Sequence, residues 1–395
     1  MTLIECFDSS HLENVVAGLR LKPDRIVFLG NQNNMGKEIE RYKRIFKERN
    51  YTPTINYYKT DNNESVESSL LKFIKPDKQC VIDITGGNEE TIFSIATAVA
   101  NLDDNLKENV SVQRFNLNYY AEDCDNDGEY LKGERANINV EELIELYGGK
   151  IHPKAEQPDE KCSPETIMPL WNTMISNPKD WNNMISALND FESGIYGDTI
   201  RFSLSEKRTH IKNFDVEKER FKDLRIKLKM NGIITDNSGP DRINYTYKNS
   251  FFHDCVKKQG NILELKVLLE ARRIKENNKP FFNDCQMSVT IDWDGITYGV
   301  PNTKNEIDVM LMRDATPVFI SCKNGGVGED ELYKLSEVAD RFGGEFAKKV
   351  LVVTDNDCKD GFVERAKDMG IHLFQNSREF EAKDWENMFR KICKN

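Results

Sequence analysis

The chain has 395 residues, a formal net charge of -11 and 38% hydrophobic residues. This length predicts two or three domains, and no apolar run approaches the roughly 18 residues that suggest a membrane span. The acidic balance argues against constitutive coating of nucleic acid, because such binding relies on Lys and Arg contacts to phosphate. Nine cysteines without a CxxC pair indicate neither a disulfide framework nor a zinc finger. The first residues lack the pattern of a secretion signal, so we expect a cytoplasmic protein without membrane contact.

The first part of the chain, residues 1–148, alternates apolar and amphipathic stretches. The apolar runs, each short enough for a strand, are at 3–7, 25–30, 80–85 and 110–117. The helical stretches between them are at 34–50 and 88–102. Strands that alternate with helices in this way predict a parallel sheet with crossover helices, as in a Rossmann-like α/β domain.

Three loops of small or polar residues follow expected strands in this domain. A strand, a small-residue turn and a helix start together form a ready anion site, because free N–H groups and the helix dipole favour phosphate. A Gly-Gly pair before a helix is also often a plain turn, so the pattern leaves both interpretations open. The absence of GxGxxG argues against a nicotinamide cofactor. The candidate ligand-binding residues are Asp8, Ser9, Ser10, Gly30, Asn31, Gln32, Thr85, Gly86, Gly87 and Asn88.

The middle of the chain, residues 149–255, begins with a polar linker that contains proline. Helical segments follow around Trp171 and Trp181, and a strand, a turn and a second strand close the region. Helices followed by a hairpin predict a winged-helix-like connector. Between them, residues 201–230 carry ten Lys or Arg against five acids. This basic stretch is either a solvated helical face or a path for nucleic acid.

The C-terminal part, residues 256–395, carries the pattern that bears most on function. Two strands joined by a short turn bring Asp308 alongside Ser321 and Lys323, because residues two apart on a strand share a face. The aspartate would hold a divalent cation, and the lysine would position the attacking water and stabilise negative charge during phosphodiester cleavage. A solvated turn or a surface ion pair gives the same spacing, so the spacing alone leaves this alternative open.

The order helix, hairpin, helix, strand around these residues resembles the PD-(D/E)xK fold of restriction endonucleases. The resemblance implies that Glu264 and Asp308 bind Mn²⁺ or Mg²⁺, since hard cations prefer oxygen ligands, and that Lys323 assists catalysis. Ser321 departs from the family, because it stands where the acid of the acid-x-lysine pair is expected. The backbone carbonyl of Cys322 or a water could fill that metal position.

The motif DITGGN after the fourth expected strand and the serine loop after the first resemble a CARF domain. The whole chain is similar to nucleases of type III CRISPR systems with one CARF domain per chain. This resemblance implies activation by cyclic tetra-adenylate, bound as one ring across a homodimer. It also implies cleavage of DNA, either single-stranded or nicked supercoiled duplex, and possible cleavage of single-stranded RNA.

Two rival functions remain open on the sequence. The first is a ligand-responsive winged-helix DNA-binding regulator whose nuclease domain is inactive, and Ser321 is its best support. The second is an ordinary α/β enzyme that binds a mononucleotide at the N-terminal glycine loop.

Two further patterns are not expected to carry chemistry. Residues 123–134 match the calcium-loop pattern D-x-D-x-D-G-x5-E, but the flanking sequence is strand-like and NDG favours a hairpin turn. The side chain of Cys322 should point into the core, because it alternates with Ser321 and Lys323.

Overall fold

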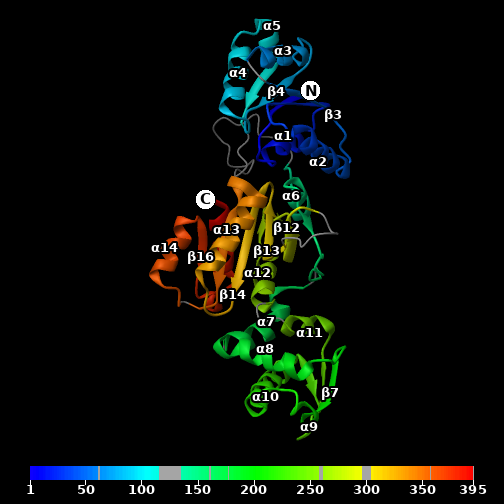
Figure 1. The fold of residues 1–395 in the computed structure, drawn as a ribbon, viewed down its shortest axis with the longest axis vertical. Helices are drawn as coiled ribbons and strands as arrows, with labels where there is room; N and C mark the ends of the chain where they lie inside the picture. Colours follow the sequence, from blue (N-terminus) through cyan, green and yellow to red (C-terminus); the bar gives the residue numbers. More distant parts are fainter. Residues whose placement is uncertain are drawn as a thin grey trace.

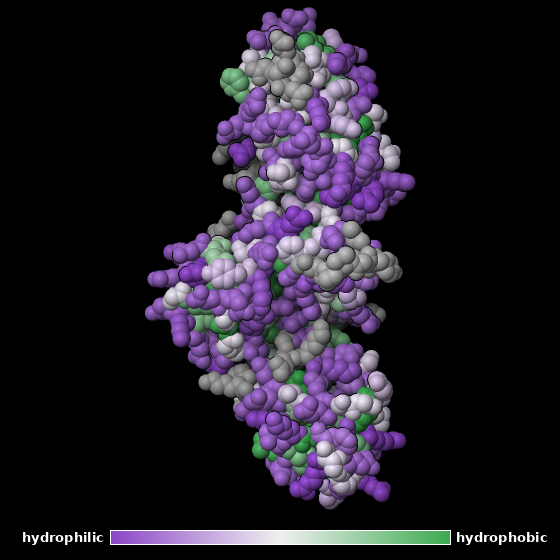
Figure 2. All heavy atoms as spheres, viewed as in Figure 1, coloured by the Kyte–Doolittle hydropathy of each residue, from purple (hydrophilic) through white to green (hydrophobic). Residues whose placement is uncertain are grey.

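The computed structural model describes residues 1–60, 63–114, 135–159, 162–176, 178–257, 261–295, 304–355 and 357–394. The molecule is elongated, with the N-terminal domain at one end, the C-terminal domain in the centre and the middle domain at the opposite end (Figure 1). Hydrophilic side chains cover most of the face shown in Figure 2. None of the helices in these ranges combines the length and apolar character needed to cross a bilayer. The calcium-loop pattern at 123–134 lies outside the described residues.

The N-terminal domain contains a five-stranded parallel sheet with the order β3-β2-β1-β4-β5. Its strands are β1 (Thr2–Cys6), β2 (Arg25–Gly30), β3 (Thr54–Lys59), β4 (Cys80–Asp83) and β5 (Val110–Gln113). Its helices are α1 (Glu13–Leu21), α2 (Met35–Glu48), α3 (Asn63–Phe73), α4 (Glu89–Ala100), α5 (Asp104–Lys107) and α6 (Val140–Leu146). The predicted Rossmann-like fold is confirmed.

The strand order of this sheet explains where a ligand can bind. Strands β1 and β4 are buried along their whole length, as expected for a parallel sheet covered on both faces. They are neighbours although they are not consecutive in the chain, so the loops that follow them lie side by side at the switch point of the sheet. In open α/β sheets this is the position where ligands bind.

The middle domain combines helices with a three-stranded antiparallel sheet of order β7-β9-β8. Its elements are α7 (Pro164–Ile175), α8 (Pro178–Glu192), β7 (Thr199–Ser203), α9 (Leu204–Lys207), α10 (Phe214–Met230), β8 (Ile234–Asp236), β9 (Arg242–Tyr247) and α11 (Ser250–Lys257). Helices packed on a small antiparallel sheet agree with the predicted winged-helix-like connector.

The basic stretch 201–230 is not one continuous helix. Its first residues belong to β7, which forms an antiparallel pair with β9. On α10, Arg220 lies 2.6 Å from Glu217 and Lys222 lies 3.3 Å from Glu219. Neighbouring acids neutralise these two cations, as is typical of a solvated helical face.

The C-terminal domain is built on a six-stranded mixed sheet of order β16-β15-β14-β13-β12-β6. Its strands are β6 (Lys150–Ile151), β12 (Asp284–Asp292), β13 (Lys304–Arg313), β14 (Thr316–Lys323), β15 (Lys348–Val353) and β16 (Ile371–Phe374). Two short strands, β10 (Lys275–Glu276) and β11 (Lys279–Pro280), form a separate hairpin. The helices are α12 (Asn261–Arg273), α13 (Glu329–Gly343), α14 (Asp360–Asp368) and α15 (Ala382–Lys394), with 3-10 turns η2 (Gly344–Phe346) and η3 (Ser377–Glu379).

Two helix layers enclose this sheet. Helices α12 and α15 pack with one set of strand side chains, and α13 and α14 pack with the other. The hairpin β13–β14 lies in the middle of the sheet with helices on both sides (Figure 1). This arrangement confirms the predicted restriction-endonuclease-like α/β domain.

The N-terminal and C-terminal domains share one continuous hydrophobic core. Phe28 and Tyr42 of the first belong to the same buried cluster as Phe319 and Phe342 of the second. Helix α6 contacts α2 on one side and β12, β13 and α13 on the other. The two domains are therefore packed firmly against each other.

A buried ion pair adds to this junction, and its removal should destabilise the protein. Arg20 of α1 binds Asp314 in the β13–β14 turn, and both side chains are buried. We expect Arg20→Ala to lower the free energy of unfolding by about 3–5 kcal/mol, because it leaves a buried carboxylate without its partner. Denaturant unfolding measures this change. The exposed pair of Lys43 and Glu40 is the control, and Lys43→Ala should change stability by less than about 1 kcal/mol.

Candidate active site and ligand cavity

Asp308 occupies the point where strands β13 and β14 separate. Their ladder runs from the turn as far as Val309 opposite Ile320. Beyond this pair, the Asp308 carboxylate accepts a hydrogen bond from the Cys322 N–H at 2.6 Å and one from Ser321 Oγ at 3.2 Å. The aspartate thus binds a backbone group of the neighbouring strand, and its carboxylate is fixed at the edge of the ladder.

Lys323 lies between two carboxylates in a small pocket of about 70 Å³. Its Nζ is 3.7 Å from Asp308 Oδ2 and 3.0 Å from Glu331 Oε2. Burial opposes the charge of Lys323, but the two acids outweigh burial and raise its pKa. For Asp308, burial raises the pKa, while Lys323, the Cys322 N–H and Ser321 act in the opposite direction. The structure therefore brings together Asp308, Ser321 and Lys323 as predicted.

The neighbourhood of Cys322 also includes Glu264. The thiol is 3% exposed and belongs to the core, as expected from the strand alternation. Burial raises its pKa most, and the negative charges of Asp308 and Glu264 raise it further. Glu264, in the first turn of α12, is thus close enough to act electrostatically on the strand that carries Ser321 and Lys323. A thiol with a raised pKa is a poor nucleophile.

The acidic residues here suit a hard divalent cation with few protein ligands. Across the described ranges, no group of three or more His, Cys, Asp or Glu side chains is arranged to hold a metal ion. Mg²⁺ commonly keeps several waters and binds through one or two carboxylates. Asp308 with one further carboxylate fits this requirement.

The loop after Lys323 consists of Asn324, Gly325 and Gly326. In the structure Thr354 holds it: the Gly325 N–H donates to Thr354 Oγ1 at 3.0 Å, and Thr354 Oγ1 donates to Asn324 Oδ1 at 2.9 Å. Asn182 of α8 exchanges two hydrogen bonds with Asn324, of 3.4 and 3.3 Å. The middle domain therefore contacts the loop of the candidate active site directly.

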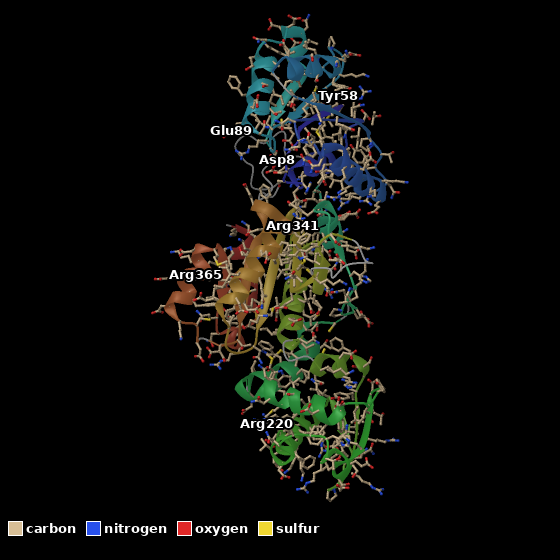
Figure 3. All side chains as sticks on the ribbon, viewed as in Figure 1. Asp8, Tyr58, Glu89, Arg220, Arg341 and Arg365 are labelled. Atoms are coloured by element: carbon tan, nitrogen blue, oxygen red, sulfur yellow. The ribbon has the colours of Figure 1, made fainter. Side chains whose placement is uncertain are left out.

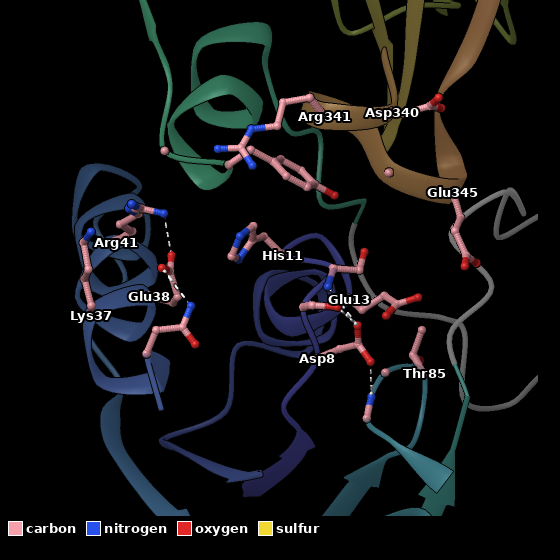
Figure 4. A pocket seen from close by; sticks show the side chains of 18 of the residues that line it. Asp8, His11, Glu13, Lys37, Glu38, Arg41, Thr85, Asp340, Arg341 and Glu345 are labelled. Carbon is pink, nitrogen blue, oxygen red and sulfur yellow. Dashed lines mark hydrogen bonds and ion pairs between the residues drawn. The ribbon is translucent and has the colours of Figure 1, made fainter. Parts of the chain in front are cut away.

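A second, larger cavity of about 950 Å³ lies between the N-terminal and C-terminal domains. Asp8 and Arg341 lie on its two sides (Figure 3). Helix α2 and the loops after β1 and β4 form one wall, and the end of α13 forms the opposite one (Figure 4). The candidate ligand residues that line it are Asp8, Ser9, Ser10, Thr85, Gly86 and Gly87.

The other candidate ligand residues do not line this cavity. Asn88 caps α4, since its Oδ1 accepts the Thr91 N–H at 2.8 Å, and its amide contacts Asn31 Oδ1 at 3.4 Å. Gln32 donates to the Phe7 carbonyl at 3.5 Å. A Cβ on Gly30 would lie 2.9 Å from the Phe7 Cβ, so this glycine serves close packing. These four residues support the loops behind the cavity.

The backbone N–H groups expected to bind an anion are partly used inside the protein. Asp8 accepts hydrogen bonds from the N–H groups of Ser10 at 2.8 Å and Gly87 at 2.9 Å. The Thr85 N–H donates to Asp83 at 2.8 Å. The expectation of free donors is wrong for these three groups, because the strand-end aspartates take them. A ligand would instead meet hydroxyl groups and charged side chains.

The positively charged residues of the cavity were not predicted from the sequence. Lys37 and Arg41 lie one turn apart on α2, and Arg114 and Arg341 add two more cations. The spacing of Lys37 and Arg41 could have indicated a shared face, whereas Arg341 comes from another domain. His11 also lines the cavity, and its pKa is lowered to about 4 by burial and then by nearby arginines, so it is neutral at pH 7.

The fold and the two sites define a class of protein, namely a Rossmann-like domain joined to a restriction-endonuclease-like domain. Residues 258–390 match the family described as "Card1-like, endonuclease domain", which confirms the nuclease resemblance for this part of the chain. No curated protein matches the chain.

Two solved structures extend the comparison to the whole chain. Protein VC1899 from Vibrio cholerae is similar with a TM-score of 0.70 and 16% identity, covering 100% of this chain and 97% of that chain. Can2 from Sulfobacillus thermosulfidooxidans, solved in complex with cyclic tetra-adenylate, has a TM-score of 0.63 and 14% identity, with coverage of 100% and 97%. At this identity the likeness shows the fold, and the resemblance predicted from the sequence is confirmed at that level.

Proposed function

We propose that the protein is a metal-dependent endonuclease that cyclic tetra-adenylate activates, and that it acts in type III CRISPR antiviral defence in the cytoplasm. The observation that carries this proposal is the arrangement of Asp308 and Lys323 in a Card1-like endonuclease domain. The fold shared with Can2, whose structure contains cyclic tetra-adenylate, supports the activator.

In the proposed reaction each residue of the active site has one role. Asp308 and Glu264 bind Mn²⁺ or Mg²⁺, together with the Cys322 carbonyl. When bound, the ion polarises the phosphate and lowers the pKa of water. Lys323 holds the attacking water and stabilises the negative charge that develops on the phosphate. Ser321 donates a hydrogen bond that orients Asp308.

The cavity between the domains is the proposed ring site. Residues of the loops after β1 and β4 contact the ring, and two copies of the chain share one ring in a homodimer. Helix α13 supports coupling between the sites. Its last turns carry Asp340 and Arg341 into the cavity (Figure 4). Its first turn places Glu331 on Lys323. Ring binding is allosteric if the ring prefers one arrangement of this helix.

The experiment that tests the function is gel-based cleavage of labelled single-stranded DNA, single-stranded RNA and supercoiled plasmid with Mn²⁺. Each substrate is incubated with and without cyclic tetra-adenylate. Cleavage that needs both ring and metal supports the proposal and identifies the substrate. The second candidate, a winged-helix regulator, is favoured by Ser321 at the acid position. A sequence-specific footprint without any cleavage would support that regulator.

Ring binding should weaken as the pH rises from 7 to 9. The pKa of Glu13, which lines the cavity, is raised to about 8, first by burial and then by Asp8, Glu345 and Asp83. Its carboxyl is therefore neutral below this pH and becomes negative above it, where it repels a polyanionic ring. We expect the affinity for the ring to fall roughly threefold to tenfold, because the repulsion between Glu13 and the ring is worth about 1 kcal/mol.

Calorimetry at the two pH values measures this change. In Glu13→Gln the dependence on pH should disappear, whereas the exposed control Glu48→Gln should retain it. An unchanged pH dependence in Glu13→Gln would show that another group is responsible.

A further inference from the structure

The active-site pocket contains a carboxylate that the sequence motif does not include. Glu331, in the first turn of α13, lines the same pocket as Asp308, Ser321 and Lys323. Its Oε2 lies 3.0 Å from Lys323 Nζ, which is closer than the 3.7 Å that separates Asp308 from the same nitrogen. Two acids from different elements therefore face one common cation.

Ser321 cannot supply a second negative charge here. Its hydroxyl donates to Asp308 at 3.2 Å, so it supports the aspartate rather than adding a charged ligand. Glu331 comes from a helix that packs over the sheet on the side where this pocket opens. Its other oxygen, Oε1, binds Lys334 at 3.2 Å, so contacts fix the carboxylate at both oxygens. The helix N-terminus also favours a negative charge at this place.

We propose that Glu331 is a further carboxylate of the active site, in addition to Asp308 and Glu264, and replaces the acid missing at Ser321. The inference rests on the proposed nuclease function. Asp308 and Glu331 both contact Lys323 and line the same pocket, so their carboxylates are close enough to share a divalent cation that waters also bind. Because Glu331 of α13 then supplies the negative charge, position 321 needs no carboxylate and holds a serine.

Mn²⁺ binding to the full-length protein, measured by electron paramagnetic resonance without ring or substrate, tests this inference. We expect Glu331→Gln to weaken Mn²⁺ binding about ten- to a hundredfold and to reduce ring-activated cleavage. The double variant Ser321→Glu with Glu331→Gln restores a carboxylate to the pocket, and we expect it to recover both properties. Glu337→Gln, at an exposed position of the same helix, is the matched control and should change neither.

Each outcome decides the inference. Unchanged Mn²⁺ affinity in Glu331→Gln overturns it. Weaker Mn²⁺ binding without recovery in the double variant also overturns it, because Glu331 would then only stabilise the local structure. If no substrate is cut under any condition, the proposed function fails, but the Mn²⁺ measurements still decide the role of Glu331.

Discussion

Replacing Asp308 by asparagine is expected to lower ring-activated cleavage by at least about a hundredfold, as for the loss of a group that stabilises charge in the transition state. The substitution keeps the size of the side chain and an oxygen that can accept the Cys322 N–H, so the fold should persist. It removes the negative charge that would bind the metal. Ring affinity, measured by calorimetry, should remain that of the unmodified protein, because Asp308 does not line the interdomain cavity.

Asp360→Asn is the control for this prediction, since Asp360 is exposed on α14 of the same domain. It should leave both cleavage and ring affinity unchanged. Cleavage that persists in Asp308→Asn would contradict the assignment of the active site.

Replacing Gly87 by alanine should weaken ring binding by about tenfold or more, since backbone strain of 1–3 kcal/mol corresponds to that range. Gly87 has a φ of 96°, which side chains rarely tolerate, and an added Cβ would lie 2.5 Å from the Cys6 Cβ. The loop that holds Asp8 and lines the cavity must then move. Half-maximal activation should need more ring, as measured by the dependence of the cleavage rate on ring concentration.

Gly361 offers a matched control. An added Cβ there meets no atom within 4 Å, and the residue lies in the first turn of α14. Gly361→Ala should bind and respond to the ring like the unmodified protein. Equal ring affinity in Gly87→Ala and Gly361→Ala would show that the glycine loop is not part of the ring site.

The contact between Asp308 and Lys323 was predictable from the sequence because it is local. Asp308 and Lys323 lie on consecutive strands joined by a short turn, and the hairpin together with strand alternation brings their side chains to one face. Glu331 was not found, since its contact with Lys323 depends on how α13 packs over the sheet. Other residues of α13 lie differently: Lys334 lines the pocket, whereas Asp330 contacts Lys334 at the surface and Tyr333 binds Arg365.

At the ligand cavity, the sequence predicts the position of the loops but not the residues that can bind a ligand. The strand-end loops were located correctly, because a parallel sheet brings the ends of β1 and β4 together. The hydrogen-bond donors of the cavity were not predicted correctly, since the sequence does not reveal that Asp8 already accepts the Gly87 N–H. Arg341 lies more than 200 residues further along the chain, and only the packing of the two domains brings it to the cavity.

In the proposed function, ring binding switches on metal-dependent cleavage. The most direct test is the initial rate of plasmid or single-strand cleavage in Mn²⁺ as cyclic tetra-adenylate is titrated into a fixed, high concentration of the protein. We expect a rate that rises with added ring and reaches its plateau at one ring per two chains. A rate that does not depend on the ring, while calorimetry shows that the ring is bound, would contradict it.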